Sequence, residues 1–418
     1  MQLGDIYTIG KEVIKRMSNR NNGNAKDRHK KQKKTLLFSV IAVMIGLILA
    51  GVAYAWSIFG KMDIQELDDS EVGINEDLSS EVLETLDGYT NIALFGLDNR
   101  SINNYASGHS DAIMIASINN KTKDVKIVSL YRDTYLNVGG GKYAKANAAY
   151  QRGGVTQAIK MLNMNLDLDI TEYICVDWAA LIEAIDALGG IEIELTSAEV
   201  KYLNQYVKDM SHEIGSESKL VSGSGVKKLT GAQATAYARI RYTAGNDFKR
   251  SSRQRIVLEA MLNKAKDANV KTLIDICNNV FDDISTSLKL SEILSLAKDV
   301  NAYNIASTSG FPFKMTTEIP DKFDTSNYSI VAPVGLSNNV AELHKYLFET
   351  EDYEPSTTVR IISDTIVKKT GVTEQAPSIN VDEFNNTAGQ TGTDFKEEET
   401  EAEEMEEETE MELELELE

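Results

Sequence analysis

Three short apolar segments between residues 91 and 130 decide the fold of this chain: NIALFGL at 91–97, AIMIASI at 112–118 and VKIVSL at 125–130. Each is rich in isoleucine, valine and leucine and has little alternation between polar and apolar residues. Strands covered on both faces have this pattern, whereas a strand with one solvated face alternates. The segments therefore predict a central β-sheet with a layer of helices on each side.

Helical and strand patterns alternate along the rest of the domain. We expect helices at residues 147–163 (with a break at Gly153-Gly154), 178–188, 230–242, 248–268, 271–281, 291–300 and 338–348, and strands at 172–176, 191–195, 304–307 and 328–332. Residues 211–228, rich in Ser, Gly, Glu and Lys, predict a surface loop. The alternation favours the α/β class, as an α-β-α layered sandwich with a mixed central sheet.

A long uncharged segment precedes this domain: TLLFSVIAVMIGLILAGVAYAWSIF at residues 35–59. As a helix it would be about 37 Å long, enough to cross a hydrocarbon core of about 30 Å. Ten basic residues stand before it, and acidic residues follow it from Asp63. The positive-inside rule therefore predicts one transmembrane helix with a cytoplasmic N-terminus and an extracytoplasmic domain. A cleaved signal peptide is the alternative, because Ala53-Tyr54-Ala55 matches a cleavage site, but the apolar segment is longer than is usual for one.

Composition divides the chain into five parts. We expect a basic cytoplasmic segment (1–34), the transmembrane helix (35–59), a polar connector (60–87), one catalytic domain (88–350) and a flexible tail (351–418). Residues 397–418 contain 14 glutamates and no basic residue, which is two thirds of the net charge of −21. Such a segment repels itself and buries too little apolar surface to fold.

Other chemistries find little support in the sequence. Basic residues are concentrated before the apolar segment, where they fit a topogenic flank rather than a nucleic-acid site, so we expect no nucleic-acid partner. Cys175 and Cys277 lie in apolar surroundings typical of small core residues, although a single bridge between them stays open. Nucleophile elbows, Walker loops and His-Glu-x-x-His motifs are absent.

Two aspartates stand at strand boundaries and form a candidate metal site. Asp98 ends one predicted strand and Asp111 begins the next. If these strands are neighbours, the two carboxylates face each other at one edge of the sheet, where Mg²⁺ would be held with phosphate oxygens. The alternative is turn chemistry, because aspartate is favoured where strands end.

Arginines gather in three other places. Arg132 follows the strand at 125–130, at the end of the strand where ligand crevices form in α/β sheets, and Asp133 is placed to orient it or to accept a substrate proton. Arg250, Arg253 and Gln254 have the spacing of one helix face near a helix start, which suits an anion, with Asp247 before them as a candidate N-cap. Arg239 and Arg241 are two residues apart, so both reach one site only if their helix ends or distorts there.

With these pieces in this order, the domain resembles the LytR-CpsA-Psr family of Gram-positive bacteria over roughly residues 90–300. The stretches that carry the resemblance are NIALFGLD, SDAIMIASIN, VKIVSLYRDTYL, KANAAYQRGG, VDWAALIEAIDALGGIEIEL, LTGAQATAYARIRY and DFKRSSRQR. The resemblance implies a membrane-anchored phosphotransferase that moves anionic glycopolymers, such as teichoic acid or capsular chains, from polyprenyl pyrophosphate to peptidoglycan. It also implies an apolar tunnel for the polyprenyl chain.

The resemblance assigns roles by position. It matches Asp98 and Asp111 to metal-associated aspartates, with Mg²⁺ as the ion and Mn²⁺ as an alternative. Its pyrophosphate-contacting positions are Arg132, Lys145, Arg239, Arg241, Arg250 and Gln254, with Arg253 beside them. The resemblance does not identify the general base, for which Asp133 and Asp247 are candidates on reach alone.

One position departs from the family pattern. Many members carry Arg-Ser-Asp where this chain has His109-Ser110-Asp111. Neutral imidazole offers one donor, whereas arginine is always charged and forked. We therefore expect a weaker phosphate contact at His109 that strengthens when His109 is protonated.

Two other functions stay open at this point. One is a non-catalytic sensor or regulator that binds polyprenyl-linked wall precursors. The other is a pyrophosphatase that acts on the same lipid, with water in place of the glycan acceptor.

Overall fold

The three apolar segments form adjacent strands at the centre of a seven-stranded sheet in the computed structural model of the protein, in the order β1-β10-β7-β2-β3-β4-β11. β2 (Tyr89–Leu97), β3 (Ser110–Asn119) and β4 (Asp124–Leu130) pair antiparallel in succession. β7 (Glu172–Val176) runs parallel to β2, and β11 (Asn304–Phe311) runs parallel to β4. The sheet is therefore mixed, as predicted.

The structure describes residues 63–65, 67–68, 70–97, 110–214, 219–241, 246–268, 284–320 and 329–381. The remaining helices are α2 (Ser80–Asp87), α3 (Ala148–Leu166), α4 (Trp178–Ala187), α5 (Ser197–Ile214), α6 (Gly231–Arg239), α7 (Asn246–Lys266), α9 (Leu290–Lys298), α10 (Leu336–Phe348) and α11 (Thr357–Thr370). The remaining strands are β1 (Asp63–Ile64), β5 (Tyr135–Asn137), β6 (Tyr143–Lys145), β8 (Ile191–Leu195), β9 (Gly225–Leu229), β10 (Ile284–Thr286), β12 (Lys314–Thr316), β13 (Ala332–Pro333) and β14 (Ile379–Asn380).

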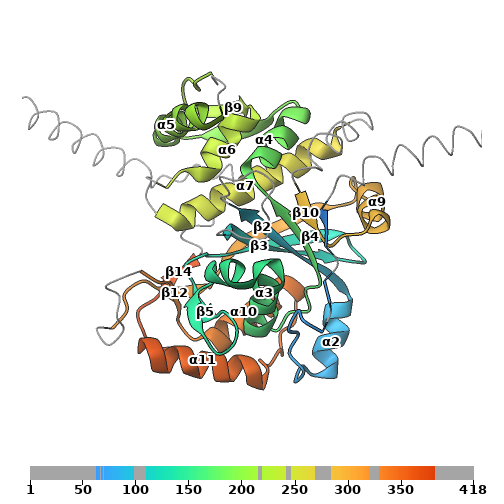
Figure 1. The fold of residues 1–418 in the computed structure, drawn as a ribbon, viewed down its shortest axis with the longest axis vertical. Coiled ribbons are helices and arrows are strands. Elements are labelled where there is room, and N and C mark those ends of the chain that lie inside the picture. The colour runs from blue at the N-terminus through green and yellow to red at the C-terminus, as the bar shows by residue number, and fades with distance from the viewer. Residues whose placement is uncertain are drawn as a thin grey trace, which may run out of the picture. The chain divides into compact units, whose positions relative to one another are not determined.

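Helices cover both faces of the sheet, as the apolar strands require. On one face, Ala93, Phe95 and Ile115 pack into a large core with α3, α10 and α11. On the other face, alternate residues of the same strands, such as Ile92 and Met114, form a smaller core toward α7 and α9. Figure 1 shows the sheet between these two helical layers. The α/β layered architecture is thus confirmed.

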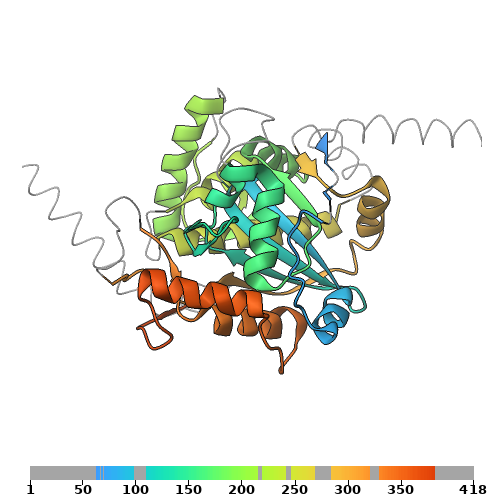
Figure 2. The same cartoon turned by 60° about the horizontal axis from the view of Figure 1, so that its bottom comes forward.

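A third core, intermediate in size, lies beyond α7. It is formed by α4, β8, α5, β9 and α6, whose buried side chains contact Val257 of α7. β8 and β9 pair with each other rather than with the main sheet. In Figure 2 the long helix α5, drawn in light green, stands away from the sheet at the edge of this group. The group holds the end of α6 beside the start of α7, where six of the predicted site residues lie: Arg239, Arg241, Asp247, Arg250, Arg253 and Gln254.

Local sequence signals explain where several elements begin and bend. Thr230 caps α6 in a capping box with Gln233, and Asp177 caps α4 by accepting from the amide of Ala180. α3 is interrupted at Gly153 and Gly154, where the backbone is not helical, as the sequence predicted.

The folded unit extends beyond both predicted boundaries. Within the predicted connector, α2 forms and Val72 and Leu86 are fully buried. Within the predicted tail, α11 forms and buries Val359, Ile362 and Ile366 in the large core. The boundary at residue 350 is therefore wrong, because the amphipathic segment that follows completes the core. The acidic run lies outside the described residues.

Several observed elements were not predicted from the sequence: the helices α2, α5 and α11 and the strands β1, β5, β6, β9, β10, β12 and β14. α5 lies between predicted elements, although its residues Val200, Leu203, Val207 and Met210 recur at helical spacing. β9 occupies part of the predicted loop at 211–228, and it buries only Leu229, so it carries almost no strand pattern.

Some predictions lie outside the described residues. These are the transmembrane helix at 35–59, the helix at 271–281, Cys277, Asp98 and His109. Among the described helices, none is both long enough and apolar enough to cross a membrane. Cys175 is a buried free thiol whose sulfur lies 3.4 Å from the Tyr150 hydroxyl, and burial raises its pKa to about 12.

Candidate active site

The fold brings charged residues from four distant parts of the sequence to one end of the sheet. Asp111 is the second residue of β3, and Arg132 follows β4. β3 and β4 are antiparallel, so the start of one strand lies beside the end of the other. Arg241 lies just after α6, while Asp247 and Arg250 lie in the first turns of α7.

Asp111 lies at the centre of this cluster. Its Oδ1 accepts from Arg132 Nη1 at 2.6 Å, and its Oδ2 accepts from Arg241 Nη2 at 3.2 Å. Arg250 Nη1 is 3.9 Å from Oδ2, and Arg250 Nη2 donates to the Asp111 backbone carbonyl at 3.2 Å. One carboxylate therefore holds three guanidiniums from three elements.

Asp247 contacts the same three guanidiniums. Its Oδ2 is 3.0 Å from Arg250 Nη2 and 3.3 Å from Arg132 Nε, and its Oδ1 is 3.8 Å from Arg241 Nε. The sequence suggested Asp247 as an N-cap, but it lies inside α7, with Asn246 before it. Asp247 is an ion-pair partner in the cluster.

Burial and the neighbouring charges shift the pKa values of two arginines in the cluster, Arg250 and Arg132. The side chain of Arg250 is only 3% exposed, and burial together with Arg132 and Arg241 lowers its pKa to about 10, although Asp247 and Asp111 oppose the shift. Burial also acts to lower the pKa of Arg132, but Asp247 and Asp111 outweigh it, so that this pKa is raised. A polyanion placed here would offset the repulsion among the guanidiniums.

Lys145 reaches the cluster from the end of β6. Its Nζ donates to Asp133 Oδ1 at 3.0 Å, while Asp133 Oδ2 lies 3.9 Å from Arg132 Nε. The backbone carbonyl of Arg132 also accepts from the amide of Asn147, just after β6. The turn after β4 and the end of β6 are thus tied together, which fixes Lys145 beside Arg132.

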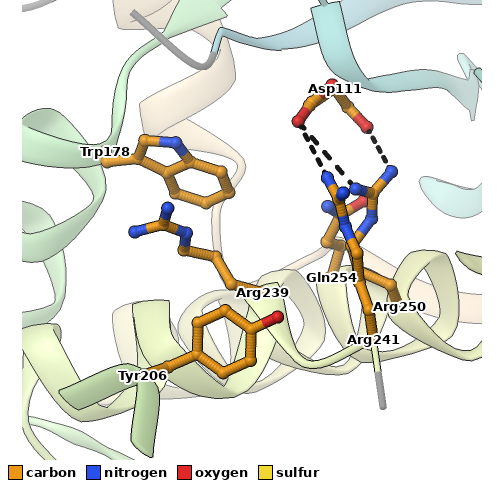
Figure 3. A pocket seen from close by; sticks show the side chains of 7 residues that line it. All are labelled: Asp111, Trp178, Tyr206, Arg239, Arg241, Arg250 and Gln254. Carbon is orange, nitrogen blue, oxygen red and sulfur yellow. Dashed lines mark hydrogen bonds and ion pairs between the residues drawn. The ribbon is translucent and has the colours of Figure 1, made fainter. Parts of the chain in front are cut away.

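A pocket opens against the cluster. It is lined by Asp111, Trp178, Tyr206, Arg239, Arg241, Arg250 and Gln254. Figure 3 shows Arg239 extending between the rings of Trp178 and Tyr206, and its Cζ lies 5.7 Å and 5.9 Å from the two ring centroids. These are cation–π distances, which hold the guanidinium at the pocket wall.

Gln254 contributes a donor to this pocket. Its side chain is buried, and its Nε2 has no hydrogen-bond partner among the described residues. A buried amide without a partner is costly, and a ligand oxygen in the pocket would satisfy it.

Arg253 differs from its neighbours on α7. Its Nε donates to Glu199 of α5 at 2.9 Å, and its Nη1 donates to the Ile240 carbonyl at 3.3 Å. It is absent from the residues that line the pocket. The structure therefore brings Arg132, Lys145, Arg239, Arg241, Arg250 and Gln254 together but places Arg253 behind them.

Arg239 and Arg241 reach one pocket because their helix ends between them. α6 ends at Arg239, and Ile240 has φ −58° and ψ 126°, which is extended rather than helical. The carbonyl of Ile240 is the one held by Arg253. The helix end at Arg239 thus meets the condition under which both arginines can reach one site.

Trp178 and Tyr206 were not predicted as site residues. Trp178 is the only tryptophan outside the apolar segment at 35–59, and it follows the N-cap Asp177, which gave a weak signal. Tyr206 lies on α5, the helix that was overlooked, so its position at the pocket had no basis in the prediction.

The donor set suits a hard divalent cation in part. Asp111 lines the pocket, and Mg²⁺ is usually bound by one or two carboxylates together with phosphate oxygens. Its proposed partner Asp98 follows β2 and lies outside the described residues. The described residues contain no group of three or more His, Cys, Asp or Glu side chains arranged to hold a metal. A bound ion would therefore depend on ligand oxygens.

The fold and the site define a class of protein: a layered α/β domain with an arginine-rich pocket for a polyanion at one end of its sheet. Within this class, the chain belongs to the LytR-CpsA-Psr family, whose family model matches residues 60–340. The family assignment from the sequence is confirmed.

Curated relatives and a solved structure agree with this membership. The chain is 30% identical over 275 residues to the polyisoprenyl-teichoic acid–peptidoglycan teichoic acid transferase TagU of Enterococcus faecalis (strain ATCC 700802 / V583), covering 63% of this chain and 82% of the relative. It is 29% identical over 274 residues to TagU of Bacillus cereus (strain ATCC 14579), covering 64% and 84%. The crystal structure of protein gbs0355 from Streptococcus agalactiae has a similar fold, with a TM-score of 0.51, 24% identity and coverage of 68% of this chain and 95% of that chain.

Proposed function

We propose that this protein is a membrane-anchored phosphotransferase that attaches an anionic glycopolymer, of the teichoic acid or capsule type, from polyprenyl pyrophosphate to peptidoglycan. The observation that carries the proposal is the convergence of Arg132, Arg241 and Arg250 on Asp111 beside a pocket, in a member of this family. The relatives named above are teichoic acid transferases that act on peptidoglycan, which supports the same class of reaction here.

The geometry suits a pyrophosphate. Arg241 is the most accessible of the three guanidiniums, with 42% of its side chain exposed, whereas Arg132 and Arg250 are largely buried. Forked guanidiniums bind phosphate oxygens in pairs, and burial strengthens these contacts because little water competes. Arg241 and Arg239 would receive the pyrophosphate, while Arg250 and Gln254 would contact it from the floor of the pocket.

The reaction proceeds by nucleophilic substitution at phosphorus. A peptidoglycan hydroxyl attacks the phosphorus nearer the polymer, a new phosphodiester bond forms, and the bond to polyprenyl phosphate breaks. Negative charge grows on the phosphate oxygens and on the leaving group, and the guanidiniums are placed to stabilise it. The hydroxyl proton passes to a base of the protein.

Asp133 is the better placed of the two candidate bases. Asp247 engages both carboxylate oxygens with guanidiniums, so we assign it to positioning Arg132, Arg241 and Arg250. Asp133 has one oxygen bound to Lys145 at 3.0 Å, while its other oxygen has only a 3.9 Å contact with Arg132. We therefore propose that Asp133 accepts the proton.

Asp111, with Asp98, would hold Mg²⁺ when it is bound, with Mn²⁺ as an alternative. The ion would neutralise charge on the phosphate oxygens. Asp111 already orients three guanidiniums without a metal, so it has a second role that does not depend on the ion.

The membrane is the expected location of both enzyme and donor. The apolar segment at 35–59 would anchor the chain in the cell membrane with the domain outside. Because the polyprenyl donor lies in the same membrane, anchoring raises the effective concentration of the donor at the enzyme.

Turnover by the purified full-length chain tests this function. The chain would receive a short polyprenyl-pyrophosphate saccharide, a peptidoglycan oligomer and Mg²⁺, and attachment of the saccharide to the oligomer would be measured by mass spectrometry. Arg132→Ala should reduce attachment by about 100-fold, because it removes a transition-state contact worth several kcal/mol. Lys208→Ala, on the exposed side of α5, is the matched control and should leave attachment unchanged.

Each alternative function has its own outcome in this assay. Saccharide released without attachment to the oligomer would identify a pyrophosphatase. Tight binding of the lipid without any product would identify a sensor of wall precursors. Attachment that persists in Arg132→Ala would remove the arginine cluster around Asp111 from the mechanism.

A further inference from the structure

The described part of the chain ends in contact with the residue that precedes Arg132. Val381 is 1% exposed, and its amide donates to the Phe313 carbonyl at 3.0 Å. Val381 and the Tyr131 side chain both pack against Gly310, where even a single Cβ would collide with them. Tyr131 directly precedes Arg132, so the chain leaves the described fold next to the turn that carries a site residue.

The sequence beyond Val381 ends in a strongly acidic segment. Residues 382–396 form a spacer of 15 residues, and residues 397–418 hold 14 glutamates without a single basic residue. A spacer of this length spans at most about 50 Å when fully extended. The acidic segment is therefore tethered within reach of the pocket.

The pocket has the complementary charge. Its lining holds the guanidiniums of Arg239, Arg241 and Arg250, which outnumber the two carboxylates that contact them, those of Asp111 in the lining and Asp247 beside it. Arg241 is accessible, with 42% of its side chain exposed. The buried Nε2 of Gln254 also lacks a partner among the described residues, which a carboxylate oxygen would supply. The same donors that suit phosphate oxygens accept glutamate carboxylates.

We propose that the acidic segment 397–418 binds the arginine pocket of its own chain and competes there with pyrophosphate-bearing ligands. The proposal rests on the proposed function only for the identity of the competing ligand, because the pocket and the segment are complementary whatever reaction follows.

The size of the effect follows from tethering. A ligand on a short linker has an effective concentration in the millimolar range. A segment whose intrinsic dissociation constant is roughly 0.1–1 mM would therefore weaken pyrophosphate binding about twofold to tenfold. The effect should shrink at high salt, since contacts between exposed charges are screened over about 3 Å at 1 M.

Trp178 provides a local probe of the pocket. The chain has two tryptophans, Trp56 and Trp178, so Trp56→Phe leaves Trp178 as the only one. In this background we would compare the chain with a full-length variant in which all 14 glutamates of 397–418 are glutamine. Acrylamide, a neutral quencher, should reach Trp178 at least about 1.5 times more readily in the glutamine variant at low salt, and equally in both chains at 1 M salt.

Binding of inorganic pyrophosphate, followed by calorimetry, gives the second measurement. The glutamine variant should bind it about twofold to tenfold more tightly at low salt. Arg241→Gln removes the accessible partner of the segment, so in that background neutralising the glutamates should change neither Trp178 quenching nor pyrophosphate affinity. This comparison distinguishes docking from the general effect of net charge.

The outcomes are distinct from those of the proposed function. Equal quenching of Trp178, or equal pyrophosphate affinity, in the two chains overturns the docking of the acidic segment. An equal gain in affinity with and without Arg241 overturns it as well, because the effect is then one of net charge. Failure to transfer a saccharide overturns the phosphotransferase and leaves the Trp178 comparison unaffected.

Discussion

Asp111 shows how one residue serves two requirements of the site. Its carboxylate accepts from Arg132 and Arg241, and its backbone carbonyl accepts from Arg250. Without a carboxylate here, three guanidiniums in a largely buried cluster would repel one another. The same carboxylate is the described member of the proposed metal pair.

Asp111→Asn separates these two roles. Binding of inorganic pyrophosphate without metal should be unchanged or tighter, because the cluster gains one positive charge. Transfer with Mg²⁺ should fall at least about 100-fold, because charge stabilisation at phosphorus is lost. Calorimetry and the saccharide attachment assay measure the two effects.

The control for Asp111→Asn is Asp124→Asn at the far end of β4. It changes the charge equally without touching the pocket, so both measurements should match the unmodified chain. If Asp111→Asn lowered pyrophosphate affinity and transfer by the same factor, the carboxylate would act only by holding the guanidiniums.

At the scale of the element, the pair of Glu199 on α5 and Arg253 on α7 fixes the end of α6. Arg253 contacts the Tyr237 ring, with its Cζ 5.8 Å from the ring centroid, and it donates to the carbonyl between Arg239 and Arg241. Arg253 is 5% exposed. It is therefore a positioning residue for the two arginines.

Glu199→Gln leaves the Arg253 charge buried without its partner. Breaking a buried pair in this way costs about 3 kcal/mol of unfolding free energy, and misplaced arginines should weaken pyrophosphate binding about tenfold. Urea unfolding followed by circular dichroism measures the first effect, and calorimetry the second. In the double variant Glu199→Leu/Arg253→Met, stability should recover while pyrophosphate binding stays weak; recovery of both would show that the pair only stabilises the fold.

His344 on α10 predicts a pH dependence of stability. Its ring stacks on Tyr353 at 3.7 Å between centroids, and its Nε2 donates to the Leu166 carbonyl at 2.9 Å. Burial lowers its pKa to about 4, against the opposing effects of that carbonyl and of Asp167. The unfolded chain, with a pKa near 6.5, therefore takes up a proton first as the pH falls.

The free energy of unfolding should fall by about 3 kcal/mol as the pH falls from about 6.5 to 4, because the unfolded chain binds a proton at His344 before the folded chain does. Carboxylates titrate in the same range, so the effect is measured as a difference from His344→Gln, by urea unfolding at pH 7 and pH 4. The unmodified chain should lose about 3 kcal/mol more than the variant over this interval. Parallel losses in the two chains would mean that His344 is not neutral in the fold.

Helices and strands could be predicted from the sequence where their burial determines the pattern of apolar residues. β2, β3 and β4 are covered on both faces, so their sequences are apolar throughout and leave little ambiguity. β9 failed this test because it pairs only with β8 and buries one side chain. α5 carried an amphipathic pattern, yet its polar composition near residue 211 resembles a loop.

Prediction of the site succeeded where sequence spacing limits geometry. Helical spacing correctly placed Arg250 with Gln254 on one face, whereas the contact between Asp111 and Arg132 follows from the pairing of β3 with β4, which was not predicted. Spacing also grouped Arg253 with them, but a tertiary contact with Glu199 directs it elsewhere. The aromatic wall of Trp178 and Tyr206 depends on how α4 and α5 pack, which no local pattern contains.

At the scale of the whole molecule, the C-terminal segment is part of the domain. Asp167, with no exposed surface, accepts from the amide and hydroxyl of Ser356, both at 2.7 Å, and from the Tyr353 hydroxyl. Asn75 donates to the same carboxylate at 2.6 Å, so one buried side chain joins the N-terminal and C-terminal segments to the end of α3. The family match ends at residue 340, before this attachment.

A chain that ends at residue 350 should therefore fail to fold. Without α11, the buried side chains of Val359, Ile362 and Ile366 are lost from the large core. Their burial contributes roughly 5–9 kcal/mol, which is comparable to the total stability of a typical domain. Circular dichroism should detect no cooperative unfolding in this chain. A chain that ends at residue 381 keeps α11 and β14 and should unfold cooperatively at nearly the temperature of the full chain.

Two isoleucines on α11 refine this prediction without removing any of the chain. Ile366 is 1% exposed and lies in the large core, whereas Ile361 is 60% exposed on the same helix. Ile366→Ala should lower the unfolding free energy by about 3 kcal/mol through the cavity that it leaves, and Ile361→Ala by less than about 0.5 kcal/mol. Both substitutions change helix propensity equally, so their difference in urea unfolding measures the packing of α11 alone. Equal, small effects would mean that α11 contributes little to the core, and that residue 350 is after all the functional end of the domain.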